Sequence, residues 1–352
     1  MISRHLKNTV IWSLTICTCV VTAPTRGADQ VTRVSDGATV RGKIETLSRT
    51  AILIRQSGDE TTTISPDDIR EVRFDREPVP LQIARSNERG GSYRAAVKQL
   101  QKVLSEYTGR DQRVSIEIAF LIARCQTRLA LVDPKATPTA LASLQTFLQR
   151  NSNGYRTLEA MLLQAQLLAG TDRSQAIQLL EQLRRSGVDG FVTQAGVVLG
   201  RALLGDDKPD QAREIFDDVI RDSQGKTTAL AAHYDSRIGR AECLLMQDQL
   251  QEALKDLKDV IDEIPDDQHT ALARAWLQTG HCHRRSDQPR AALLAYLHVD
   301  LLYSDAAVEH AEALYQLRPL WEAAGHPERA SDTQSRLKDQ YPNSKWAQPD
   351  KQ

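Results

Sequence analysis

Two hydrophobic periods divide the chain. Between residues 29 and 76, apolar and polar residues alternate in short runs separated by turn residues, a pattern typical of β-strands. From residue 77 onward, apolar positions are spaced three or four residues apart, as on one face of an α-helix. The pattern therefore predicts a small all-β segment followed by a long helical region.

Five short strands are expected in the first segment, residues 29–76. The alternating or β-branched runs are residues 30–34, 39–47, 51–55, 61–64 and 69–74. Asp36-Gly37 and Ser57-Gly58-Asp59 supply turns between them, and residues 65–68 are suited to one helical turn. Five strands joined this tightly predict a small closed barrel.

The order of residues in this segment resembles that of SH3-like and Sm-like barrels. The resemblance lies in Val31, Gly42-x-Ile44, Ile52-x-Ile54 and Asp68-Ile69-x-x-Val72. Sm-like barrels often bind RNA, and binding of single strands needs a basic groove and stacking rings. Here Arg and Lys are fewer than Asp and Glu, and Phe74 is the only aromatic residue. We therefore expect a docking or capping module that binds no nucleic acid.

The helical region repeats one arrangement of residues at intervals of about 34 to 40 residues. A small residue is followed four positions later by an aromatic residue or Leu, then by an aliphatic residue, then by Pro or a polar residue. Two successive copies are Ala253, Leu257, Val260, Pro265 and Ala292, Tyr296, Val299, Ser304. A period of this length indicates stacked helical hairpins, which commonly bind other proteins and rarely catalyse reactions.

This repeat resembles the tetratricopeptide repeat (TPR), in which two antiparallel helices form each unit. In the unit that begins at Ala273, the large and small positions of the family are matched by Trp276, Gly280, Ala292, Tyr296 and Val299. About seven helical hairpins would cover residues 77–344, followed by a tail at 345–352. The resemblance implies a mainly α fold, a TPR-like solenoid after the small barrel. An irregular helical bundle is disfavoured because the copies stay in phase.

The resemblance also implies a binding surface, because in TPR proteins the first helix of each unit lines a concave groove. The groove positions hold apolar residues and, in the N-terminal half, arginines. They are Arg85, Phe120, Arg124, Met161, Val197, Arg201, Leu277, His281 and Tyr315. Arg binds carboxylates bidentately, so these residues predict a peptide that carries acidic groups. The other interpretation is that the apolar residues pack between repeats and the arginines are ordinary solvated charges.

We recognise no arrangement of residues for catalysis or cofactor binding. His281, Cys282 and His283 are one and two positions apart, so they do not share the helix face that a metal site requires. The sequence contains no Gly-rich phosphate loop, no HExxH and no GxSxG. We therefore expect a non-enzymatic protein without a cofactor or a bound metal.

Residues 1–28 resemble a cleaved export signal. A positively charged start precedes an apolar stretch from Thr9 to Val21. As a helix this stretch would span about 20 Å, less than the ~30 Å core of a bilayer, which favours a signal over a membrane anchor. Cleavage is expected after Gly27 or Ala28, with lipidation at Cys17 as an alternative. No integral membrane span is expected after the signal is removed.

The net charge and the three cysteines outside the export segment limit the class of protein further. The chain has a formal net charge of −1, and the export segment contains basic but no acidic residues, so the rest is more acidic. This balance gives no general attraction to nucleic acid or anionic lipid. Cys125, Cys243 and Cys282 are too few and too far apart for a disulfide framework. Their apolar neighbours predict three buried thiols.

Together these features predict an exported protein of the periplasm or cell envelope that acts as a scaffold or adaptor for a partner protein or peptide. The ending Tyr341-Pro342-Asn343-Ser344-x-Trp346-Ala347 resembles the repeat ends of periplasmic TPR proteins that assist outer-membrane or cell-wall assembly. The alternative is a structural envelope protein whose repeats self-associate, which leaves a homo-oligomer open.

Overall fold

The computed structural model describes residues 27–348 of the 352-residue chain. The expected export signal therefore lies almost entirely outside the described residues, as do the last four residues of the expected tail. The first described elements are five strands and one helical turn: β1 (Asp29–Arg33), β2 (Thr39–Leu47), β3 (Ile52–Arg55), β4 (Thr61–Ile64), η1 (Pro66–Asp68) and β5 (Ile69–Arg73).

The five strands form one antiparallel sheet in the order β4-β3-β2-β1-β5. Val31 of β1 pairs with Val40 of β2 on one side and with Val72 of β5 on the other. Among the described strands, β4 and β5 do not pair with each other, so the sheet has two edges and is open. The five predicted strands are present, but the predicted closed barrel is wrong.

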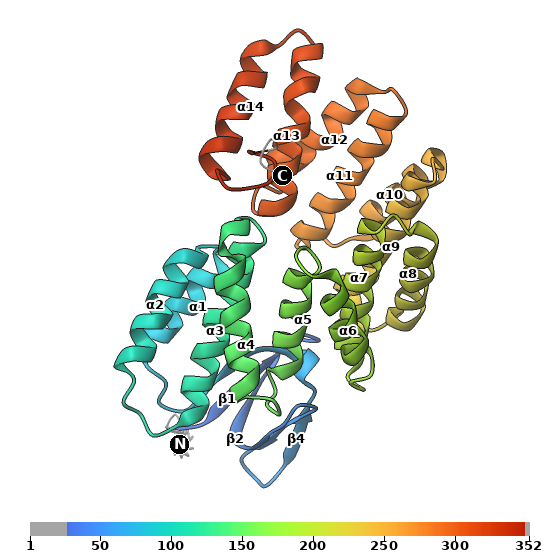
Figure 1. Cartoon of the computed structure of the whole chain (residues 1–352). Coiled ribbons are helices and arrows are strands. Elements are labelled where there is room, and N and C mark those ends of the chain that lie inside the picture. Colours follow the sequence, from blue (N-terminus) through green and yellow to red (C-terminus); the bar gives the residue numbers. More distant parts are fainter. Residues whose placement is uncertain (1–26, 349–352) are drawn as a thin grey trace, which may run out of the picture.

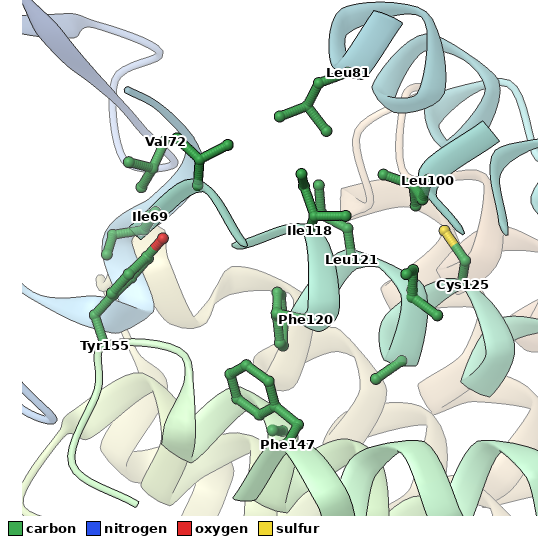
Figure 2. Close-up of a cluster of buried hydrophobic side chains, with 14 of the residues drawn as sticks. Ile69, Val72, Leu81, Leu100, Ile118, Phe120, Leu121, Cys125, Phe147 and Tyr155 are labelled. Carbon is green, nitrogen blue, oxygen red and sulfur yellow. The ribbon is translucent and has the colours of Figure 1, made fainter. Parts of the chain in front are cut away.

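The sheet stays open because its apolar face is buried against helices instead of against itself. An alternating strand buries one face, and that face needs a partner layer. Strand residues and helix residues share one buried cluster, which includes Ile52, Ile54, Ile64, Val72, Leu81, Leu100 and Ile118. Figure 2 shows Ile69 and Val72 of β5 in this cluster, with Tyr155 beside Ile69. The sheet and the first helices therefore share one core.

Fourteen α-helices follow in the described part of the chain and pair into seven hairpins. They are α1 (Val79–Arg89) with α2 (Tyr93–Glu106), α3 (Gln112–Ala130) with α4 (Thr137–Arg150), α5 (Thr157–Leu168) with α6 (Arg173–Arg184), α7 (Asp189–Gly205) with α8 (Pro209–Ser223), α9 (Leu230–Met246) with α10 (Leu250–Glu263), α11 (His269–Arg285) with α12 (Pro289–Leu302), and α13 (Ala307–Ala323) with α14 (Pro327–Gln340). Three second helices begin at a proline, which fits the first turn because its missing N–H breaks no helical bond.

The first helices of the hairpins line the inside of the solenoid (Figure 1). From α3 to α13, each first helix contacts the next first helix as well as its own partner. We call α1, α3, α5, α7, α9, α11 and α13 the inner helices. Their succession gives a continuous surface built from one helix per hairpin.

Large rings set into glycine positions hold successive hairpins together. Phe216 of α8 is fully buried between α7 and α9. A Cβ atom on Gly200 of α7 or on Gly239 of α9 would lie only 2.5 or 2.4 Å from that ring. The Tyr296 ring of α12 meets Gly280 of α11 in the same way, here within a single hairpin. The small and large positions of the repeat are therefore two halves of one packing contact.

The sheet lies across the N-terminal ends of three inner helices. At the start of α3, Arg113 Nη1 donates to Asp29 Oδ2 of β1 at 2.8 Å. At the start of α7, the backbone N–H of Gly190 donates to Asp67 Oδ2 at 2.8 Å. In Figure 1 the strands lie at the same end of the stack as the starts of α3 and α5. The sheet therefore covers one edge of the N-terminal half of the solenoid.

The two ends of the solenoid also meet, because the stack completes a turn. Asn343, after α14, donates from Nδ2 to Asp133 Oδ2 at 2.9 Å and accepts at Oδ1 from Lys135 Nζ at 2.9 Å. Val132, which follows α3, packs against the buried cluster of the last hairpin around Leu314 and Tyr341. Residues about 210 positions apart are thus in contact. The described chain forms a closed turn of hairpins, with α13 and α14 above the end of α3 (Figure 1).

The three cysteines have the predicted environment. Cys125, Cys243 and Cys282 are free and buried in inner helices, and burial raises the pKa of each thiol. A thiol with a raised pKa is a poor nucleophile at neutral pH. Among the described helices, none has the length and hydrophobicity needed to cross a membrane.

Candidate binding surface on the inner helices

A buried carboxylate joins the inner helices α3 and α5 in the N-terminal half of the solenoid. Glu117 of α3 accepts hydrogen bonds from Tyr155 Oη at 2.6 Å and from Arg156 Nε and Nη2 at 3.1 and 2.9 Å. The Glu117 side chain is 0% exposed and that of Arg156 is 2% exposed. Because Arg156 immediately precedes α5, this pair fixes the start of α5 against the side of α3.

Burial and pairing act on the pKa of Glu117 in opposite directions. Burial alone would raise the pKa, but the charge of Arg156 and the hydrogen bonds from Arg156 and Tyr155 outweigh it and lower the pKa to about 2. Burial likewise disfavours the charged guanidinium of Arg156, and the charges of Glu117 and Glu159 more than offset this. The pair is therefore ionised throughout the neutral range.

We expect the Glu117–Arg156 pair to stabilise the protein least in acid. Because the folded-state pKa of Glu117 is lowered from its ordinary value of 4.5, its contribution is complete above about pH 4.5 and is lost as the pH falls towards 2. The difference in unfolding free energy between wild type and Glu117→Gln should therefore be constant from about pH 8 to 5 and shrink below that range. Urea unfolding at stepped pH measures it. A difference that is still constant at about pH 3 would contradict this account.

The same chain of charges continues across the inner helices. Glu159 of α5 accepts from Arg156 Nη1 at 2.8 Å and from Arg124 Nη1 of α3 at 3.1 Å. Arg124 also donates from Nε and Nη2 to both oxygens of Glu88 on α1, at 2.7 and 3.0 Å. The Phe120 ring is fully buried beneath the two guanidinium groups, 5.2 Å from Arg124 and 4.8 Å from Arg156.

Two arginines that we predicted to face an acidic peptide are therefore already paired. Arg124 is 18% exposed, and Glu88 and Glu159 supply its carboxylates. Arg85 does not line the groove at all, since it is 3% exposed between β5 and α1. It donates to Glu77 Oε1 at 2.5 Å and to the backbone oxygen of Val72 at 2.7 Å. Arg85 binds to the sheet because β5 is an edge strand, and the backbone carbonyl of Val72, which is not paired with another strand, lies next to α1.

The inner helices of the C-terminal half carry a ladder of ion pairs, one between each neighbouring pair of helices. Arg201 of α7 donates to Asp235 Oδ1 of α9 at 3.2 Å. Arg274 of α11 also pairs with Asp235, and its Nη2 donates to Glu309 Oε1 of α13 at 2.7 Å. Arg201 and Asp235 are 32% and 25% exposed. Arg274 and Glu309 are 17% and 8% exposed. The Arg201–Asp235 end of the ladder is therefore accessible to solvent, and its Glu309 end is buried.

The other predicted groove residues divide into buried and accessible ones. Met161, Val197 and Leu277 are buried, as the packing interpretation expects. His281 of α11 is 22% exposed, and its Nε2 lies 3.3 Å from Glu312 Oε1 of α13. Tyr315 of α13 is half-buried, and its ring is 5.2 Å from that of Trp346 in the segment after α14. Of the predicted set, Arg201 and His281 thus offer the accessible polar groups of the C-terminal half.

The sequence-based prediction missed the acidic residues that pair with the arginines of the inner helices, although the sequence contains a signal for them. Glu159, Asp235 and Glu309 follow Arg124, Arg201 and Arg274 by 35, 34 and 35 residues. An acid one repeat after an arginine occupies the neighbouring position on the next inner helix. This spacing identifies an internal ion pair, whereas we predicted that Arg124 and Arg201 face an acidic peptide or are ordinary solvated charges.

A buried hydrogen-bonded chain in the last two hairpins is structural. Both ring nitrogens of His310 are hydrogen-bonded. Nδ1 lies 2.7 Å from Tyr341 Oη, and Nε2 lies 2.9 Å from Asp300 Oδ1. Burial raises the pKa of Tyr341 to about 12, so its hydroxyl stays protonated and is a poor nucleophile. Within residues 27–348, no group of three His, Cys, Asp or Glu side chains is placed to hold a metal ion.

Comparison with solved structures shows the fold. A Rap protein complexed with competence and sporulation factor aligns with a TM-score of 0.51 at 13% identity, over 76% of this chain and 77% of that one. The apo form of the quorum sensor NprR from B. thuringiensis aligns with a TM-score of 0.51 at 14% identity, over 74% of each chain. The fold is a TPR-like helical repeat. PilW, described as a type IV pilus biogenesis factor, aligns with a TM-score of 0.44 at 18% identity, over 66% of this chain and 97% of that one.

No protein-family model matches the sequence of this TPR-like protein, and no curated protein is similar to it in sequence. The structure and its structural neighbours confirm the predicted helical-hairpin solenoid. At these levels of sequence identity, the structural similarity shows only that the helices are arranged in the same way.

Proposed function

We propose that this TPR-like protein is a non-enzymatic scaffold or adaptor of the cell envelope that binds a partner polypeptide against the inner helices of its C-terminal half. The observation on which the proposal depends is the accessible pair of Arg201 on α7 and Asp235 on α9, 32% and 25% exposed, at one end of the ladder that continues to Arg274 on α11. In the N-terminal half the corresponding surface is filled by the Glu117 network. A structural neighbour, the Rap protein, is complexed with a factor in its solved structure.

The envelope location rests on the N-terminal sequence, which resembles an export signal. The narrower proposal is a role in outer-membrane or cell-wall assembly, supported by the resemblance of the ending at residues 341–347 to repeat ends of periplasmic TPR proteins. Both are proposals about where the partner is found. The binding surface itself is tested separately.

Arg201→Ala is expected to weaken capture of the partner at least about tenfold, which corresponds to about 1.4 kcal/mol. The substitution is mild for the fold, because Asp235 keeps its ion pair with Arg274. Immobilised wild type and variant are incubated with an extract of the cell envelope, and captured proteins are quantified by mass spectrometry. Each captured protein is then titrated against both forms.

Arg213→Ala is the matched control, since Arg213 lies on the second helix α8 and is 42% exposed. It removes the same charge from the outer surface and should leave capture unchanged. If both variants capture every partner as well as wild type does, the inner surface does not bind and the proposal fails. Sedimentation at several concentrations separates the alternative: a mass that rises with concentration would favour a self-associating structural protein.

A further inference from the structure

The solvent-facing side of α12 carries leucines. Leu294, Leu301 and Leu302 are 60%, 71% and 58% exposed. Leu294, Leu297 and Leu301 are three and four residues apart, so they form one line along the helix, which we call the leucine stripe. The opposite side of α12 is also apolar and is buried against α11 and α13. A helix that is apolar on both sides normally lies in an interior, so the stripe indicates contact with another molecule.

The other second helices show that the repeat does not require this stripe. Its residues lie two, five and nine positions after the small residue Ala292. The same positions, counted from Ala212 in α8 and from Ala253 in α10, are charged and exposed. They are Glu214, Asp217 and Arg221 in α8, and Lys255, Lys258 and Asp262 in α10. None of the six other second helices of the described chain has a leucine at any of these positions. The stripe is therefore particular to α12.

An aromatic pair borders the stripe on the side of α11. His298 is four residues after Leu294 and three before Leu301, so it shares their face of the helix. Its ring is stacked on that of half-buried Trp276 of α11, with 3.9 Å between centroids and 9° between planes. Apolar and aromatic side chains gathered at one place on a surface mark a contact with another protein, whereas single exposed ones do not.

The spacing of the stripe fits packing against another helix. Steps of three and four residues match the a and d positions of coiled coils, where the side chains of two helices interlock. α12 has 14 residues, so it is about 21 Å long. A contact of one such helix per chain is at the small end of specific interfaces, so we expect reversible binding with a Kd on the order of 10 µM.

Charged residues at the two ends of the stripe select an antiparallel copy of α12 as the other helix. Exposed Arg290 lies four residues before Leu294, and exposed Asp305 lies four residues after Leu301. In an antiparallel pair centred on the stripe, Leu294 of each chain meets Leu301 of the other. Arg290 then meets Asp305 at both ends, which is a favourable charge pair. A parallel pair would instead bring the two copies of Arg290 together.

We propose that two copies of this chain pair through the leucine stripes of their α12 helices, antiparallel about a twofold axis. Both chains use the same surface, so the pairing stops at two copies. A structural protein that self-associates through its repeats would instead grow beyond two. Because α12 is a second helix, the inner helices with Arg201 and Asp235 stay free for a partner polypeptide. The pairing therefore goes beyond the proposed scaffold function and does not rest on it.

Sedimentation equilibrium of the full-length chain between about 1 and 100 µM tests the pairing. We expect the mass to rise from one chain to two and to level there. Leu294→Glu combined with Leu301→Glu gives the stripe the charged character of α8 and should raise the Kd at least about 100-fold. Both leucines are exposed, so the midpoint of urea unfolding should not fall.

Two further sets of variants identify the surface and its occupant. Glu214→Lys combined with Arg221→Glu changes charges at the equivalent positions of α8 and should leave the pairing unchanged. Arg290→Glu and Asp305→Arg should each raise the Kd about tenfold, because each brings like charges together across the two chains. The two substitutions in one chain should restore the wild-type Kd, since the charge pair is re-formed with its signs exchanged.

Several outcomes would overturn the inference. A wild type that remains a single chain at about 100 µM excludes the pair. A mass that exceeds one chain and is unchanged by Leu294→Glu with Leu301→Glu shows self-association through another surface. Failure of the exchanged charges to restore the Kd contradicts the antiparallel arrangement. If the chain stays single but binds phosphatidylcholine vesicles through Leu294, the stripe contacts a membrane instead. Arg201→Ala, which tests the scaffold function, should leave the pairing unchanged, so the two proposals fail separately.

Discussion

Replacing Glu117 with Gln is expected to lower the free energy of unfolding by about 3 kcal/mol, because removal of one partner leaves the other charge buried. Arg156 is 2% exposed, and it would keep only the shared and more exposed Glu159. Tyr155 Oη would lose a charged acceptor at 2.6 Å. Equilibrium urea unfolding, followed by circular dichroism, measures the loss. Binding of a partner to the C-terminal half should be unaffected below the unfolding transition.

Glu106→Gln is the matched control for this prediction. Glu106 on α2 is 66% exposed and lies 4.0 Å from Lys102, so its replacement should change stability by less than about 0.5 kcal/mol. Arg156→Met introduced into Glu117→Leu should recover part of the loss, since a buried pair replaced by apolar groups is far less costly than a broken one. A Glu117→Gln protein as stable as the Glu106→Gln protein would show that the pair does not hold α3 to α5.

Phe216→Ala is expected to cost about 3 to 5 kcal/mol, the range for removing a buried aromatic side chain. The ring fills the space between α7, α8 and α9, and Gly200 and Gly239 have no side chains that could move into the cavity. Because each hairpin of a solenoid contacts mainly its neighbours, the loss should appear as a separate early transition of the central hairpins. Urea unfolding and hydrogen exchange of α7 to α9 measure it.

Glu214→Ala on the same helix is the control, because Glu214 is exposed and two positions from Phe216. It should shift stability by less than about 0.5 kcal/mol. Phe216→Leu should lie between the two, since Leu leaves a smaller cavity. If Phe216→Ala unfolds in one transition together with the rest of the chain, the contact between the two ends makes the closed turn more cooperative than a simple stack.

The two halves of the inner surface differ in how their charges are satisfied. In the N-terminal half, Glu117, Arg156 and Arg124 pair with one another or with neighbouring helices and are largely buried. In the C-terminal half, the Arg201–Asp235 pair stays 32% and 25% exposed at the end of the ladder.

Local signals in the sequence were sufficient for the secondary structure. The alternation in residues 29–76 predicts the five strands, and the spacing from Ala292 to Val299 predicts a second helix. Small and large residues at fixed spacing pack the two helices of one hairpin together, so one repeat of sequence contains both sides of that contact. Gly280 and Tyr296 show this directly, because the ring occupies the space that the glycine leaves.

The candidate site was predicted only in part, for a physical reason that the arginines illustrate. Position in a TPR-like unit places Arg124 and Arg201 on inner helices, and both lie there. Whether an arginine is free depends on the residue facing it from the next helix, here Glu159 and Asp235. Arg85 was misplaced because a sheet edge, which no repeat pattern describes, receives it.

The sequence by itself determined the local elements and the stacking of hairpins, since these depend on contacts within one or two repeats. Only the tertiary structure decided that the sheet stays open on the helices, and that Asn343 meets Asp133 at the junction of the two ends. The open sheet and the contact between the two ends both depend on how many hairpins are shaped and rotated relative to one another. No single repeat encodes that.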